Sequence, residues 1–143
     1  MRRAIDRDAL LAALVLAPAT YSRNRFFDLY DDPEVRRVRR RASQIRSVVR
    51  HVTRASDAEP GEVVRVAAAP GDRVELTYAV PALGLRRTVL LDPLELSLVR
   101  FAIARSGRPV AALPADEADR ASVEAALARL APLAPQAPAD ARG

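Results

Sequence analysis

Residues 33–54 form the stretch that most limits how this chain can fold. Asp32 stands before it as a candidate N-cap, Pro33 suits the first helical position, and no further glycine or proline occurs within it. Apolar residues recur at every third or fourth position, which places them on one side of an α-helix. They are Val35, Val38, Ala42, Ile45, Val48, Val49 and Val52. The sequence therefore predicts a long amphipathic helix whose apolar side packs against another part of the protein.

The opposite side of this predicted helix carries arginines. Residues 33–54 hold eight arginines and one acid, Glu34, whereas the rest of the chain holds 15 arginines and 17 acids. The net charge of +5 therefore comes from this one segment. Six of its arginines share one side and form a row about 27 Å long at 1.5 Å per residue. This arginine stripe consists of Arg36, Arg39, Arg40, Arg46, Arg50 and Arg54.

The stripe has two interpretations, a solvated helix face and a surface that binds an anion. Solvated faces usually mix charges of both signs in pairs four residues apart, but here no acid follows Glu34 within the segment. This weakens the interpretation as a merely solvated face and leaves both interpretations open. We expect a small basic protein that binds nucleic acid mainly through phosphate contacts, with little sequence preference. An acidic protein is the other partner that such a stripe would suit.

The alternative function is a protein-interaction or assembly module with no role in nucleic-acid binding. In that case the Val and Ile side of the same helix packs on a partner or on a second copy of the chain, giving a homodimer. A third interpretation has the helix lying on an anionic membrane. It has less support, because the apolar side lacks the Trp, Phe and Leu that are usual at membrane interfaces.

Three further residues of the segment are assigned structural roles. Arg37 and Arg41 fall at the border of the apolar side, where we expect them to extend toward water or to pair with an acid of a neighbouring element. His51 is the only histidine. We expect it to be a surface residue near the stripe.

The segment "TYSRNRFFDLY" lies just before the predicted helix and contains four of the six aromatic residues. They are Tyr21, Phe26, Phe27 and Tyr30. Aromatic rings among arginines can stack on unpaired bases. The competing and favoured interpretation is a hydrophobic joint between two helices. In either case Arg23 and Arg25 join the predicted nucleic-acid contacts.

No catalytic pattern accompanies these features. The chain has no cysteine, so disulfides and thiolate metal sites are excluded. Its five glycines are widely separated, which excludes a phosphate-binding glycine loop or a dinucleotide fingerprint. Helix capping accounts for Asp32 and Glu34 better than a metal site shared with Asp28 and Asp31. We therefore expect no enzyme, no catalytic residues, no metal and no cofactor.

The first 22 residues allow two interpretations that imply different locations. One is a core helix that is capped by Asp6 or Asp8 and ends near Pro18. The other is a signal peptide covering residues 1–19, which would mean export. The two acids favour the core helix and hence a cytoplasmic protein, because signal peptides carry positive charge there. The apolar run is too short to cross a bilayer, so no integral membrane association is expected.

Beyond residue 60 the hydrophobic period changes from helical to alternating. The segments 62–69, 73–80 and 85–91 are short, β-branched and separated by "PGD" and "PALG", which predicts a three-stranded antiparallel meander. Asp92 and Pro93 begin a helix that Gly107 ends, and Asp116 caps a last helix. The sequence thus predicts one α+β domain over residues 1–131. We expect the Pro- and Ala-rich residues 132–143 to be disordered.

Overall fold

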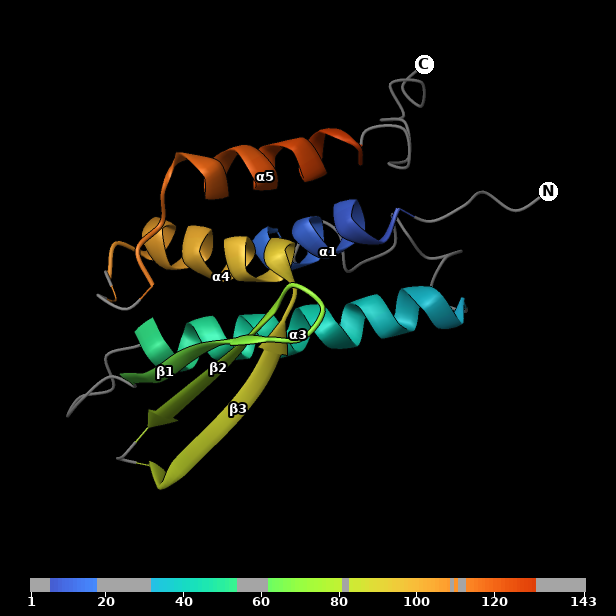
Figure 1. The fold of residues 1–143 in the computed structure, drawn as a ribbon. Coiled ribbons are helices and arrows are strands. Elements are labelled where there is room, and N and C mark those ends of the chain that lie inside the picture. The colour runs from blue at the N-terminus through green and yellow to red at the C-terminus, as the bar shows by residue number, and fades with distance from the viewer. Residues whose placement is uncertain are drawn as a thin grey trace, which may run out of the picture. The chain divides into compact units, whose positions relative to one another are not determined.

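The computed structural model describes residues 6–17, 32–53, 62–80, 83–108, 110 and 113–130. In chain order they form α1 (Arg7–Leu16), α3 (Pro33–Thr53), β1 (Glu62–Ala69), β2 (Arg73–Val80), β3 (Leu85–Leu91), α4 (Pro93–Ser106) and α5 (Glu117–Ala128) (Figure 1). The α+β class and the three predicted strands are confirmed. The predicted aromatic joint and the predicted tail at 132–143 lie outside the described residues.

The chain divides into two compact units. The first combines residues 1–43 with 124–143, and the second contains residues 44–123. The first unit therefore holds α1, the start of α3 and the end of α5. The second holds the rest of α3, the sheet, α4 and the start of α5. The single domain predicted over residues 1–131 stays a prediction.

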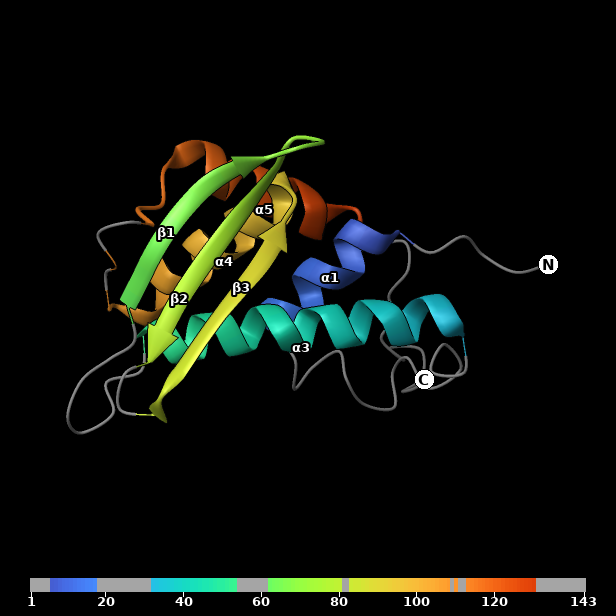
Figure 2. The same ribbon diagram turned by 60° about the horizontal axis from the view of Figure 1, so that its bottom comes forward.

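The sheet of the second unit has the strand order β1-β2-β3, and both pairs are antiparallel. On one face of the central strand Leu76, Tyr78 and Val80 are all at most 5% exposed, and Thr77, whose side chain lies on the opposite face, is also buried at 8% exposed. Helix α4 contacts β2 and β3, and Figure 2 shows it behind the sheet. On the other face, Thr77 Oγ1 lies 2.9 Å from Thr88 Oγ1 of the neighbouring strand. This cross-strand contact supports the register on the side away from α4.

The turn between β1 and β2 requires left-handed backbone. Gly71 has φ 77° and Asp72 has φ 60°. Glycine adopts this conformation without steric cost, and aspartate is one of the few other residues that tolerate it. The guanidinium of Arg73 donates from Nε to the carbonyl of Pro70 at 3.2 Å. The "PGD" signal thus forms the tight reversal that the sequence predicts.

Helix α4 begins and ends at the predicted residues. The Asp92 carboxylate accepts from the Glu95 N–H at 2.7 Å, and the Glu95 carboxylate accepts from the Asp92 N–H at 2.9 Å. This reciprocal capping box satisfies two backbone donors and accounts for the burial of Glu95. Gly107 ends the helix in the left-handed conformation at φ 73°. Local signals alone therefore set the limits of α4.

A buried carboxylate joins α5 to α4 in the second unit. Asp119 is 4% exposed and accepts a 2.8 Å hydrogen bond from the Ser97 hydroxyl. Its other oxygen accepts from the Asp116 N–H at 3.1 Å, while Asp116 caps the Asp119 N–H at 2.9 Å. The Arg100 guanidinium lies 3.8 Å from the same carboxylate. One aspartate thus fixes both the start of α5 and its position on α4.

The first unit is built on α1, in which Ala9 through Val15 are all buried. Asp6 is the N-cap: its carboxylate accepts from the Ala9 N–H at 3.0 Å and from Arg129 Nε at 2.9 Å. Ala9 and Ala13 form a cluster with Leu130, and Leu127 packs against that cluster. The residues after α5 therefore contact α1, although more than a hundred positions separate them in the sequence.

We predict that Asp119→Ala lowers the free energy of unfolding by about 2 to 3 kcal/mol, because it removes a buried charged acceptor and leaves Ser97 and Arg100 without it. Urea denaturation measures this loss. Glu117→Ala is the control, since that side chain is 90% exposed and its ion pair with Arg120 contributes less than about 1 kcal/mol. Equal losses for the two variants would contradict the role given to Asp119.

We predict that Asp6 makes stability depend on pH. The hydrogen bond from Arg129, followed by that from the Ala9 backbone, lowers the pKa of Asp6 below its ordinary value. A lowered folded-state pKa gives stability that is present above the unfolded pKa near 4 and is lost as the pH falls through the folded value. The stability difference between the wild type and Asp6→Asn should therefore shrink on acidification. Arg129→Gln should remove most of this dependence, and a difference that is constant with pH would contradict it.

Candidate anion-binding face of helix α3

The start of α3 is set by Asp32. Its carboxylate accepts from the Glu34 N–H at 2.8 Å, and its carbonyl accepts from the Arg36 N–H at 3.1 Å. At the other end, Thr53 Oγ1 donates to the Val49 carbonyl at 2.6 Å, and Arg108 Nη1 donates to the Thr53 carbonyl at 3.3 Å. A cation on the last carbonyl also complements the negative end of the helix dipole. Both ends of α3 are thus defined by hydrogen bonds.

The predicted apolar side of α3 is confirmed. Six of its seven residues are 5% exposed or less, and Val49 is half-buried. The buried six are Val35, Val38, Ala42, Ile45, Val48 and Val52. Because this side is covered, the rotation of the helix about its axis is fixed, and with it the direction of each arginine.

The stripe residues lie mostly in water. Four described members are exposed, namely Arg36, Arg39, Arg40 and Arg50, while Arg46 is half-buried next to the apolar side. Arg36, Arg39 and Arg40 are neighbours on one helical turn of the first unit; Arg46 and Arg50 belong to the second unit. Within the described part of the chain, the structure gives Arg40 and Arg50 no ion pair. The remaining predicted contacts, Arg54, Arg23 and Arg25, lie outside the described residues.

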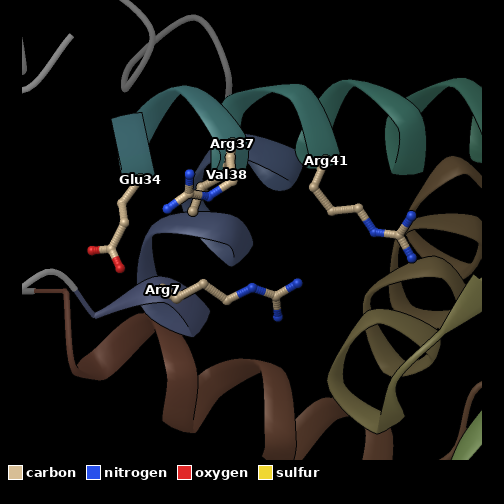
Figure 3. Close-up of a pocket in the computed structure, with 5 residues that line it drawn as sticks. All are labelled: Arg7, Glu34, Arg37, Val38 and Arg41. Carbon is tan, nitrogen blue, oxygen red and sulfur yellow. The ribbon is translucent and has the colours of Figure 1, made fainter. Parts of the chain in front are cut away.

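Arg37 and Arg41 have a setting that the helical pattern does not reveal. Arg37 is exposed and Arg41 is half-buried. Together with Arg7 of α1 they line a pocket of about 320 Å³, which is completed by Glu34 and Val38 (Figure 3). All five residues belong to the first unit. Sequence reasoning missed this pocket because Arg7 is some thirty positions away from the segment that supplies the other four.

The prediction that His51 is a surface residue is wrong. Its ring is half-buried and stacks on Tyr78 of β2, with 6.0 Å between the ring centroids and 22° between the planes. Its Nδ1 lies 3.2 Å from Ser47 Oγ. The histidine is therefore part of the packing of α3 on the sheet within the second unit. No signal in the local sequence indicates this, because the partner ring lies on a strand 27 residues further along.

The described residues give no support for a metal site or a membrane-spanning helix. No three His, Asp or Glu side chains among them are grouped so that they could hold a metal ion, and Asp28 and Asp31 fall outside these ranges. None of the described helices is both long enough and apolar enough to pass through a bilayer. Among the described residues, the arginines of α3 therefore remain the strongest candidate for a functional site.

Comparison with known proteins gives no further guide to the role of these arginines. No protein-family model, curated protein or solved structure matches the chain.

Proposed function

We propose that the protein binds nucleic acid through the arginine stripe of α3, mainly by contacts to phosphates. The observation that carries this proposal is the exposed group Arg36, Arg39 and Arg40 on one turn of a helix whose opposite side is buried. Guanidinium groups held in a row on a rigid helix suit a phosphate backbone, because each can replace a counterion condensed on the strand. Contacts of this kind give affinity with little sequence preference.

The alternative of assembly through the apolar side of α3 has less support. Val35, Ala42 and Ile45 are at most 1% exposed within the chain, so a partner could reach them only if that side were uncovered. An acidic protein that docks on the stripe instead remains compatible with the same exposed arginines. The experiment below separates an acidic protein from nucleic acid, because only the nucleic acid is present as a ligand.

The test is fluorescence anisotropy of labelled DNA and RNA oligonucleotides titrated with the protein over a series of salt concentrations. We expect log affinity to fall linearly with log salt. Arg40→Ala combined with Arg50→Ala should reduce the size of that slope by about 2, because each lost phosphate contact removes about 1. Oligonucleotides of different sequence should bind with similar affinity.

A matched pair of exposed arginines controls for the loss of overall charge. Arg65→Ala with Arg86→Ala removes the same charge from the sheet and should leave the slope close to that of the wild type. Equal effects of the two double variants would show that net charge rather than the stripe governs binding. Absence of binding at low salt would overturn the proposal and point to an acidic protein.

We propose that the protein acts in the cytoplasm. Support comes from α1, whose residues Ala9–Val15 are buried in the first unit and would be lost if a signal peptide of residues 1–19 were removed. We therefore expect the mass of the protein purified from its native host to include these residues. Intact-mass spectrometry measures this directly, and a mass lower by about 19 residues would contradict the cytoplasmic location.

A further inference from the structure

The first strand of the sheet has one edge without a partner strand. In the order β1-β2-β3, β1 lies at the end of the sheet and pairs with β2 alone (Figure 2). In an antiparallel ladder every second residue of such a strand directs its N–H and C=O away from the sheet. Within the described part of the chain, residues 65–69 make no hydrogen bond other than those of the β1–β2 ladder. This edge can therefore accept another strand.

The middle of this edge lacks the features that keep edge strands apart. Proteins protect such edges with prolines, charged side chains or bulges. The β1–β2 register shifts between Val63 and Arg65, at the beginning of the strand, and Pro70 follows its end. The residues between these two points have the sequence RVAAA, with one charge and no proline. Residues 65–69 thus form a regular and largely apolar edge segment.

The side chains of the edge segment are accessible. Arg65, Val66 and Ala68 are exposed, and the other two residues are half-buried. Among the described residues, Val66 and Leu83 are the large apolar side chains that are exposed. Val66 lies opposite Leu76 of β2, on the face that α4 covers at β2 and β3, and it is still 38% exposed. A further strand beside β1 would cover Val66 without uncovering any other part of the protein.

A second copy of the chain fits this edge, because the edge segment can pair with itself. A twofold axis perpendicular to the sheet runs the two copies of β1 antiparallel and keeps the same face of each on the same side. With the axis beside Ala67, all five residues are paired, and Val66 lies opposite Ala68 of the other copy. An axis beside Val66 or Ala68 would extend the pairing into the register shift or into Pro70. The segment therefore favours one register, centred on Ala67.

The charges of the edge segment agree with this register. Arg65 is its only charged residue, and it lies opposite Ala69 of the other copy. Like charges that stand directly opposite each other destabilise a strand pair, and this register has none. An axis beside Arg65 would instead set two guanidinium groups against each other.

We propose that two copies of the chain associate through residues 65–69 of β1, antiparallel and centred on Ala67, so that their two sheets become one continuous sheet. Five paired residues per copy are few compared with the roughly 20 to 30 of a standard interface, so the dimer is weak. We expect a dissociation constant between about 10 μM and 1 mM. This contact differs from assembly through the apolar side of α3, and it does not depend on nucleic-acid binding.

Disulfide trapping tests the pairing, because the chain has no cysteine and one introduced thiol is then the only one. In Ala67→Cys the two thiols stand opposite each other, at a Cα separation of about 4.5 to 5.5 Å that a disulfide accepts. Mild oxidation of the full-length variant should give a covalent dimer on a non-reducing gel. Ala79→Cys is the matched control, since Ala79 is also half-buried on the same face but lies on β2. Equal rates of dimer formation in the two variants would overturn the proposal.

A second set of thiols tests the register. Because Ala69 lies opposite Arg65 of the other copy, the two thiols of Ala69→Cys are far apart, and this variant alone should not crosslink. Its mixture with Arg65→Cys should form the mixed disulfide. Crosslinking of Ala69→Cys alone, at the rate seen for Ala67→Cys, would contradict the register on which the proposal rests.

Sedimentation velocity of the cysteine-free protein over a concentration series measures the association itself. The average mass should rise from monomer toward dimer. Val66→Lys should weaken the association at least about tenfold, because a charge on an edge strand opposes pairing. Leu83→Lys adds the same charge at the other exposed large apolar side chain, between β2 and β3, and should leave the association unchanged.

Two results of the sedimentation experiment would refute the dimer. Equal effects of Val66→Lys and Leu83→Lys would show that added charge, rather than the edge of β1, governs association. A wild type that stays monomeric up to about 1 mM would exclude a second copy as the occupant and leave the edge to an extended segment of another protein.

Discussion

Burial of the apolar side of α3 is the constraint on which the placement of its charges depends. Val35, Ala42, Ile45 and Val48 are covered almost completely, and a helix whose apolar side is held in this way cannot rotate. The direction of each arginine side chain then follows from its position along the helix. Arg40 and Arg50 face water, Arg46 is half-buried at the edge of the apolar side, and Arg41 is half-buried at the other edge.

The arginines of α3 consequently lie in two different environments, the exposed stripe and the pocket beside α1. Four arginines of the stripe, Arg36, Arg39, Arg40 and Arg50, are exposed to water. Arg37 and Arg41 instead line a pocket together with Arg7 of α1.

Helices and strands whose limits are set by nearby residues could be predicted from the sequence. Asp32, Asp92 and Gly107 mark helix ends through hydrogen bonds and backbone angles that involve only nearby residues, and alternation of side chains marked the strands. Contacts between distant segments could not be predicted. From the sequence, Asp119 is an ordinary acid in the first turn of a helix, and only the fold brings Ser97 to it. In the same way, only the fold brings the ring of Tyr78 to His51.

The contact of Asp6 with Arg129 has a consequence for synthesis on the ribosome. These residues are 123 positions apart, and the buried side of α1 also needs Leu130. At 5 to 20 residues per second, roughly 6 to 25 s pass between the synthesis of α1 and that of its partners. During that time Ala9 and Ala13 lack their contacts with Leu127 and Leu130. Part of the apolar surface of α1 is thus buried only after residues 127–130 have been made, and the nascent chain must stay soluble with this part exposed.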